Sequence, residues 1–132
     1  MNQKPSVVQI LKSVPQVLTS DSLKVNQLRN SLSELDDLKR KHRALAMLRT
    51  LDREAGYTLN NAVMLDWLRT IALVSTHEEL CISIEDLERL ALIRTHTVDV
   101  CTVLELTEKG GDVAHGRTIV EGVLRPPPDC PY

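Results

Sequence analysis

The spacing of apolar residues changes once along this 132-residue chain, near residue 92, and the change limits the folds open to it. Between residues 38 and 90 apolar residues recur every three or four positions, which is the period of helices buried on one face. Residues 92–98 and 100–106 instead alternate in polarity, are rich in β-branched residues and flank Asp99. That pattern predicts two strands joined by a turn. We therefore expect a mainly α fold with a small β-hairpin.

The first helix of this set is expected over residues 37–54. Its predicted buried stripe consists of Leu38, Leu45, Leu48 and Leu51, with basic residues on the opposite face. Ser33 and Asp36 have the spacing of a loose capping box at its start, and Gly56 suits the left-handed position after its end. No Gly or Pro separates this helix from residues 22–36, so one long helix and two shorter helices both stay open.

A second helix is expected over residues 60–72. Val63, Trp67 and Ile71 stand four positions apart and form its predicted buried side, with Met64 and Leu68 beside them. The candidate caps are Thr58 and Asn60.

The third helix, residues 76–90, has the clearest start signal in the sequence. Ser75 with Glu78, and Thr76 with Glu79, both have the capping-box spacing. The residues expected to be buried are Leu80, Ile84, Leu87 and Leu90.

A short closing segment follows the hairpin. A small helix is expected between Thr107, as its cap, and Gly116, just beyond its end. Residues 117–132 contain four prolines near their end and are expected to form an extended tail. Three helices, a hairpin and a closing helix, in this order over residues 37–116, predict a winged helix-turn-helix domain.

Residues 1–36 are expected to form a separate helical extension. Val7, Ile10, Leu11 and Val14 fit one face of a short helix that Pro15 ends or kinks. Further on, apolar residues recur at spacings of 3, 4 and 3, the rhythm of a helix that packs on another helix. These residues are Val25, Leu28, Leu32 and Leu35. Their partner is either the chain's own core or a second copy, and the second case predicts a homodimer.

A family resemblance rests on two spaced segments and their surroundings. The segments are Leu87-Glu88-Arg89-Leu90-Ala91-Leu92-Ile93 and Leu106-Thr107-Glu108-Lys109-Gly110-Gly111-Asp112-Val113-Ala114-His115-Gly116-Arg117. Together they resemble the end of winged-helix regulators of the MarR/ArsR type. With Ala55-Gly56-Tyr57 before them and Gly122-Val123-Leu124-Arg125-Pro126 after them, the chain over about 45–126 resembles more closely a small winged-helix family of Mu-like bacteriophages. The sequence departs from the pattern at Ala91, where Gly is usual. The resemblance implies a phage protein that acts in the host cytoplasm.

The leading functional hypothesis is DNA binding, in the regulation of gene expression. In this fold the exposed start of the third helix enters the major groove, and that start contains Thr76 and His77. The candidate phosphate contacts are the basic side chains of the first helix and of the hairpin. They are Lys39, Arg40, Lys41 and Arg43, and then Arg94 and His96.

The distribution of charge supports a second hypothesis. The net charge is only −2, but residues 38–53 hold six basic side chains against Asp52, whereas residues 76–90 hold five acidic side chains against Arg89. Carboxylates at the position that would read DNA repel phosphates. The alternative is therefore a protein-interaction module of phage development or assembly that does not bind DNA, in which the acidic helix binds a basic partner. Both charge clusters also fit plain solvated faces without a function.

We expect no enzymatic activity, no cofactor and no metal site. The sequence has no Gly-rich phosphate loop, nucleophile elbow or HExxH motif. His77 and Cys81 share a helix face, but two ligands make a poor metal site. Cys81, Cys101 and Cys130 form neither a disulfide framework nor a CxxC pair, which favours a reducing cytoplasm. No apolar run approaches the length of about 20 residues that spans a membrane.

Overall fold

The computed structural model describes residues 15–132, with side chains for Val25 and for residues 27–132. The chain divides into two compact units, residues 1–36 and residues 37–132. Helix α2 (Pro15–Arg53) belongs to both units, so residues 22–54 contain one helix and not two. The capping box expected at Ser33 and Asp36 is wrong, because both residues lie inside α2. The short helix expected around Val7, Ile10, Leu11 and Val14 falls outside the described residues.

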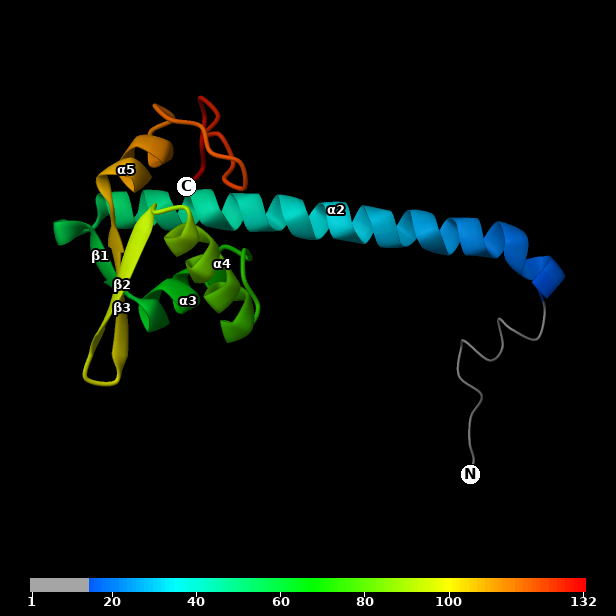
Figure 1. Ribbon diagram of the computed structural model, residues 1–132, viewed down its shortest axis with the longest axis horizontal. Helices are drawn as coiled ribbons and strands as arrows, with labels where there is room; N and C mark the ends of the chain where they lie inside the picture. Colours follow the sequence, from blue (N-terminus) through cyan, green and yellow to red (C-terminus); the bar gives the residue numbers. More distant parts are fainter. Residues whose placement is uncertain (1–14) are drawn as a thin grey trace. The chain divides into compact units, whose positions relative to one another are not determined.

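The second unit is mainly helical and has a small three-stranded antiparallel sheet (Figure 1). After α2 and a 3-10 turn (Ala55–Tyr57), its elements are β1 (Thr58–Asn60), α3 (Asn61–Thr70), α4 (His77–Arg89), β2 (Ile93–Val98), β3 (Cys101–Leu106) and α5 (Glu108–Ala114). The strand order is β1-β3-β2. The β2–β3 hairpin confirms the prediction from alternation, whereas strand β1, which pairs Leu59 with Leu104, was not predicted.

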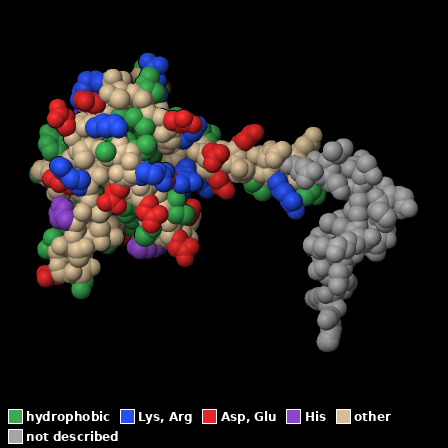
Figure 2. Space-filling view, in the orientation of Figure 1, with side chains coloured by type: hydrophobic (Ala, Val, Ile, Leu, Met, Phe, Trp, Pro, Cys, Tyr) green, Lys and Arg blue, Asp and Glu red, His purple; other side chains and the backbone are tan. Residues whose placement is uncertain are grey.

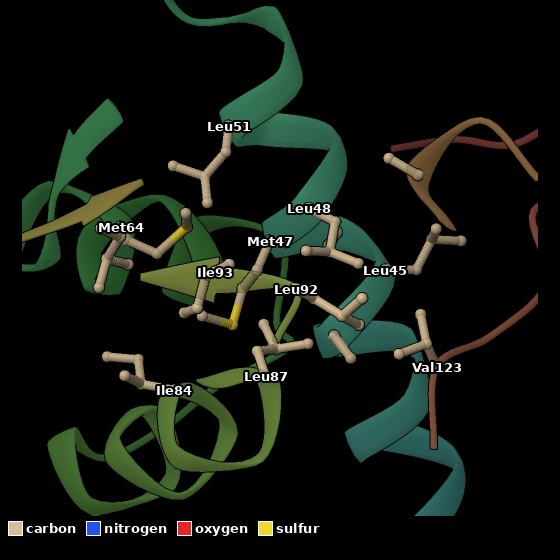
Figure 3. Packing of buried hydrophobic residues seen from close by; sticks show 14 of the residues in the cluster. Leu45, Met47, Leu48, Leu51, Met64, Ile84, Leu87, Leu92, Ile93 and Val123 are labelled. Atoms are coloured by element: carbon tan, nitrogen blue, oxygen red, sulfur yellow. The ribbon is translucent and has the colours of Figure 1, made fainter. Parts of the chain in front are cut away.

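Residues 43–48 of α2 form the centre of the core of this unit, because all six are buried. Helices α3 and α4, the sheet and the C-terminal tail each contribute buried side chains around them (Figure 3). The largest fully buried apolar side chains are Leu45, Met47, Leu48, Leu51, Met64, Leu68, Leu80, Leu87, Leu92, Ile93 and Leu104. A helix that is buried all round has neighbours on every side and leaves no exposed polar face in that stretch.

Three expected burial assignments in this unit are wrong. Leu38 was expected in the core, but 48% of its surface is exposed. Val63 and Trp67 of α3 are also exposed, while Met64 and Leu68 face the core. Trp67 lies against α2 instead, where its indole N–H donates a hydrogen bond of 3.2 Å to Thr50 Oγ1. The apolar residues of α3 surround most of the helix, so spacing alone did not identify its buried side.

Residues 117–132 contain no helix or strand, and they pack against α2 (Figure 1). Val123 is buried, and the backbone N–H of Leu124 donates to the carbonyl oxygen of Lys41 at 3.2 Å. At the end of the tail, the Tyr132 hydroxyl lies 2.7 Å from His42 Nδ1, and Arg49 Nε donates to the Tyr132 carbonyl oxygen at 2.8 Å. The tail therefore covers part of the surface of α2, a contact that the proline content did not predict.

Two backbone positions, Ala91 after α4 and Gly110 within α5, restrict which residues fit there. Ala91 follows the end of α4 with a left-handed φ of 62°, and the next amide, of Leu92, donates to Leu87 O at 2.9 Å. Gly adopts such angles without strain, whereas the Cβ of Ala91 makes this angle unfavourable. Gly110 of α5 cannot be replaced by a residue with a side chain without a shift of the backbone, because a Cβ there would lie 2.1 Å from Leu92 O. Thr107 caps α5, as expected, by accepting a hydrogen bond from Gly110 N.

Within residues 15–132, no helix combines the length and the apolar character that crossing a membrane requires.

Candidate interaction surface on helix α4

The start of α4 is fixed by the predicted capping box. Thr76 Oγ1 accepts a hydrogen bond from Glu79 N at 3.1 Å, and Glu79 Oε1 accepts from Thr76 N at 2.9 Å. The same Glu79 oxygen accepts from Ser75 N at 2.9 Å. The backbone N–H of Ser75 in the first place, then that of Thr76 and the charge of Arg43, hold the pKa of Glu79 below its usual value despite some burial. Glu79 is thus a structural carboxylate and is not free to bind a partner.

Arg43 joins α2 to the start of α4 from inside the core. Arg43 is only 4% exposed, and its Nε donates to the Leu73 carbonyl oxygen at 2.6 Å. Nη1 donates to Ser83 Oγ at 3.2 Å, and Nη2 lies 3.4 Å from Glu79 Oε2. The expectation that Arg43 belongs to an exposed basic face is wrong. A charge this deeply buried is retained only with such partners, so its role is to position α4.

Arg40 also turns toward α4, at the other end of that helix. Its Nε donates to Asp86 Oδ2 at 3.0 Å, and Arg89 Nη2 donates to Asp86 Oδ1 at 2.8 Å. Arg40 remains about half exposed, but part of its charge is neutralised within the molecule. Of the four basic residues predicted to contact a partner, Lys39 is half-buried and Lys41 is exposed. Neither forms an ion pair with another residue whose side chain the structure describes, whereas Arg40 and Arg43 both do.

The outward face of α4 is acidic with an apolar centre. Glu78, Ile82 and Glu85 are exposed and stand four and three positions apart, so they share one side of the helix, opposite Leu80, Ile84 and Leu87. Ile82 has 44% of its surface exposed. Arg89 ends this face and is held by Asp86. We call Glu78, Ile82 and Glu85 the α4 outer face.

Sequence analysis missed Ile82, although a signal was present. It falls outside the 80–84–87 apolar stripe and between two carboxylates, so helical spacing alone places it outward. Ile82 is the apolar side chain of this face, so its burial by a partner would contribute most of the hydrophobic free energy of binding there.

The predicted contacts Thr76 and His77 lie beside this face, and both are exposed. Thr76 Oγ1 is engaged in the capping box. The ring of His77 approaches Cys81, with Nδ1 3.5 Å from Sγ, so the two do share a face. Among the described residues there is no group of three or more His, Cys, Asp or Glu side chains that could hold a metal ion.

The hairpin places its two predicted contacts on exposed positions of β2. Arg94 Nε lies 3.4 Å from Glu105 Oε1 of the neighbouring strand, and His96 stands opposite Val103. At the hairpin tip two exposed valines, Val98 and Val100, stand on either side of Asp99. Figure 2 shows acidic and basic side chains interspersed over one face of the protein, without a single continuous basic surface.

A groove with a volume of about 370 Å³ runs between α2, α4 and the tail. It is lined by both charged and apolar side chains, among them Arg40, Asp86, Leu87 and Leu90. The Arg40–Asp86 ion pair lies in its wall, so these two charges neutralise each other within the groove.

Comparisons of the chain with protein-family models, curated proteins and solved structures gave no match.

Proposed function

We propose that residues 37–132 form a winged helix that acts as a protein-interaction module, with the α4 outer face as its binding surface. The fold proposal is supported by the element order α2, β1, α3, α4, β2, β3 and by the strand order β1-β3-β2. In that arrangement α4 is the helix at the recognition position and β2–β3 is the wing.

The observation that carries the functional proposal is the charge of the helix at that position. DNA-reading helices present Arg, Lys, Asn or Gln to base edges and phosphates. Here Glu78 and Glu85 project outward, and a carboxylate about 4 Å from a phosphate charge is repelled by roughly 1 kcal/mol even at the dielectric constant of bulk water. Arg43 and Arg40, which were expected to supply positive charge, are respectively buried and paired with Asp86.

The same face suits a basic, amphipathic segment of another protein. Ile82 offers an apolar contact at the centre, and Glu78 and Glu85 stand on either side of it for Lys or Arg side chains. Protein interfaces combine an apolar contact at the centre with charged groups at the rim in this way. The resemblance of the sequence to Mu-like phage proteins supports the further proposal that this module acts in phage development or assembly in the host cytoplasm.

DNA binding through Lys39, Lys41, Thr76, His77, Arg94 and His96 is the competing proposal, and the first experiment separates the two. Fluorescence anisotropy with a random-sequence duplex is measured at about 50 mM and at physiological salt, because phosphate attraction is strongest at low salt. The wild type is expected not to bind at either concentration. The Glu78→Lys/Glu85→Lys variant, with the opposite charge on the same face, is expected to gain salt-dependent binding. Wild-type binding at low salt that is lost in Lys39→Ala/Lys41→Ala would overturn the proposal.

The second experiment tests protein binding directly, with a synthetic basic amphipathic helical peptide as the probe in calorimetry. The wild type is expected to bind it, and Ile82→Ser/Glu85→Gln to bind at least about tenfold more weakly, a loss of about 1.4 kcal/mol. Glu108→Gln removes one exposed carboxylate from α5 and is the matched control. Equal binding by all three proteins would mean that the α4 outer face is not the binding surface.

A further inference from the structure

The first unit carries an apolar stripe that no described part of that unit covers. Leu28 and Leu32 are 63% and 61% exposed, and Val25 and Leu35 are exposed beside them. All four lie within α2, so they stand on a formed helix, and their spacing of three and four keeps them on one line along it. Water contact at four branched side chains in two heptads is costly and marks a surface that binds something.

The width of the stripe indicates what binds there. A helix that lies on a globular core has apolar residues over a broad face of three or four positions in every two turns. Here the positions that flank the stripe, Arg29, Ser31 and Asp36, are charged or polar, and the rest of the helix surface carries Gln27, Asn30 and Ser33; all six residues are exposed. A narrow seam of two apolar positions per heptad is the pattern of a helix that pairs with another helix of the same kind.

The charges at the edges of the stripe favour a second copy over a strongly charged partner. Arg29 and Asp36 are both exposed and have opposite signs, and the four residues between Arg29 and Glu34 carry no charge. Arg29 and Asp36 are seven positions apart, so they lie on the same side of the seam. A second copy therefore brings no concentrated like charge against this stripe, whereas an acidic or a basic helix would find only a mixed, weak counterpart.

We propose that this chain forms a homodimer in which residues 25–35 of two copies pack along the seam of Val25, Leu28, Leu32 and Leu35. This association uses the first unit alone and does not depend on the function proposed for α4. It provides two copies of the α4 outer face in one particle, so a partner with repeated basic segments would bind with increased avidity.

The test is the mass of the full chain in solution, measured by light scattering coupled to size exclusion at several concentrations. The wild type is expected at twice the chain mass of 14.8 kDa at micromolar concentration. Leu28→Glu/Leu32→Glu places two charges in the seam and is expected to give the single-chain mass. Gln27→Glu/Asn30→Glu adds the same charge to the same helix off the seam, and this matched control is expected to stay dimeric.

A second readout shows whether the seam variant still folds. Thermal unfolding followed by Trp67 fluorescence reports the second unit, and its midpoint should agree between the seam variant and the control at a concentration where both are monomeric. A wild type that has the single-chain mass at about 100 μM, a seam variant that remains dimeric, or equal dissociation of the seam variant and the control would each overturn the proposal.

Discussion

Helix α2 contains two segments with opposite surroundings. Residues 43–48 are buried on every side, including the charged Arg43, whereas residues 27–36 are exposed on every side, including three leucines. Backbone geometry is helical in both. A helical spacing of apolar residues therefore predicts that a segment is helical. Whether that segment is buried depends on which other parts of the chain pack around it.

The buried segment has partners from far along the sequence. Helices α3 and α4 and the sheet contribute apolar side chains to it, and the tail adds Val123 and the contacts of Tyr132 (Figure 3). The exposed segment has only its own narrow stripe. Substitutions of matched residues in the two segments, or in the elements that cover the buried segment, test this difference.

The largest expected difference is between two leucines. Leu48→Ala leaves a cavity in the core and should lower the free energy of unfolding of the second unit by about 3 kcal/mol. Leu28→Ala should change it by less than about 0.5 kcal/mol, because the side chain is exposed in the first unit. Urea unfolding followed by Trp67 fluorescence measures both. Similar losses in the two variants would remove the distinction between the segments.

Two arginines on the same helix provide the next comparison. Arg43→Met removes the donor to Leu73 O and to Ser83 and leaves those buried acceptors unpaired, at an expected cost of about 3 kcal/mol. Arg29→Met, at an exposed position, should cost less than about 0.5 kcal/mol. The same unfolding assay applies. An Arg43 variant as stable as the wild type would show that this buried charge does not hold α4 in place.

The Glu79 carboxylate, which lies beside Arg43, makes the stability of the second unit depend on pH. The pKa of Glu79 is lowered in the folded protein, so its contribution is complete above its unfolded value of 4.5 and is lost as the pH falls through the lowered folded pKa. Glu79→Gln keeps an oxygen that can accept from Thr76 N but removes the negative charge at the start of α4 and beside Arg43. It should therefore cost about 1 kcal/mol at pH 7 and progressively less in acid below pH 4.5. Glu78→Gln, on the exposed face, is the control. A cost that does not change between pH 7 and pH 3 would contradict the assignment.

The smallest expected change in the free energy of unfolding concerns Ala91, directly after the end of α4. Helix α4 is one of the elements that cover the buried segment. Ala91 has a φ of 62°, so Ala91→Gly relieves backbone strain and should raise the stability of the second unit by about 0.5–1 kcal/mol. Ala62→Gly, inside α3, should instead lower it by up to about 1 kcal/mol. Differential scanning calorimetry of both variants measures the two directions. Destabilisation by Ala91→Gly would mean that the Cβ of Ala91 contributes more than its strain costs.

Local signals in the sequence predicted much of the fold. The capping box at Thr76 and Glu79, the hairpin around Asp99 and the cap at Thr107 are all confirmed, because each depends on residues close together in the chain. Strand β1 could not be found in this way, since three residues are too short for a period and gain their strand conformation by pairing with β3.

Burial and site geometry were predicted less well for the same reason. Arg43 looked like one more basic residue of an exposed cluster, and only the fold brings Leu73 O and Ser83 to its guanidinium. Arg40 likewise meets Asp86 across 46 positions of sequence. Ile82, by contrast, could have been found from helical spacing, because it lies off the buried stripe of α4.

Hydrogen exchange along α2, followed by mass spectrometry at two protein concentrations, tests the difference between its segments most directly. Amides of residues 43–51 are expected to exchange slowly at both concentrations, because they open only with the core. Amides of residues 25–36 are expected to exchange fast in dilute protein and slowly when the concentration favours the dimer. Equally slow exchange of both segments in dilute protein, or fast exchange of residues 43–51, would contradict the account.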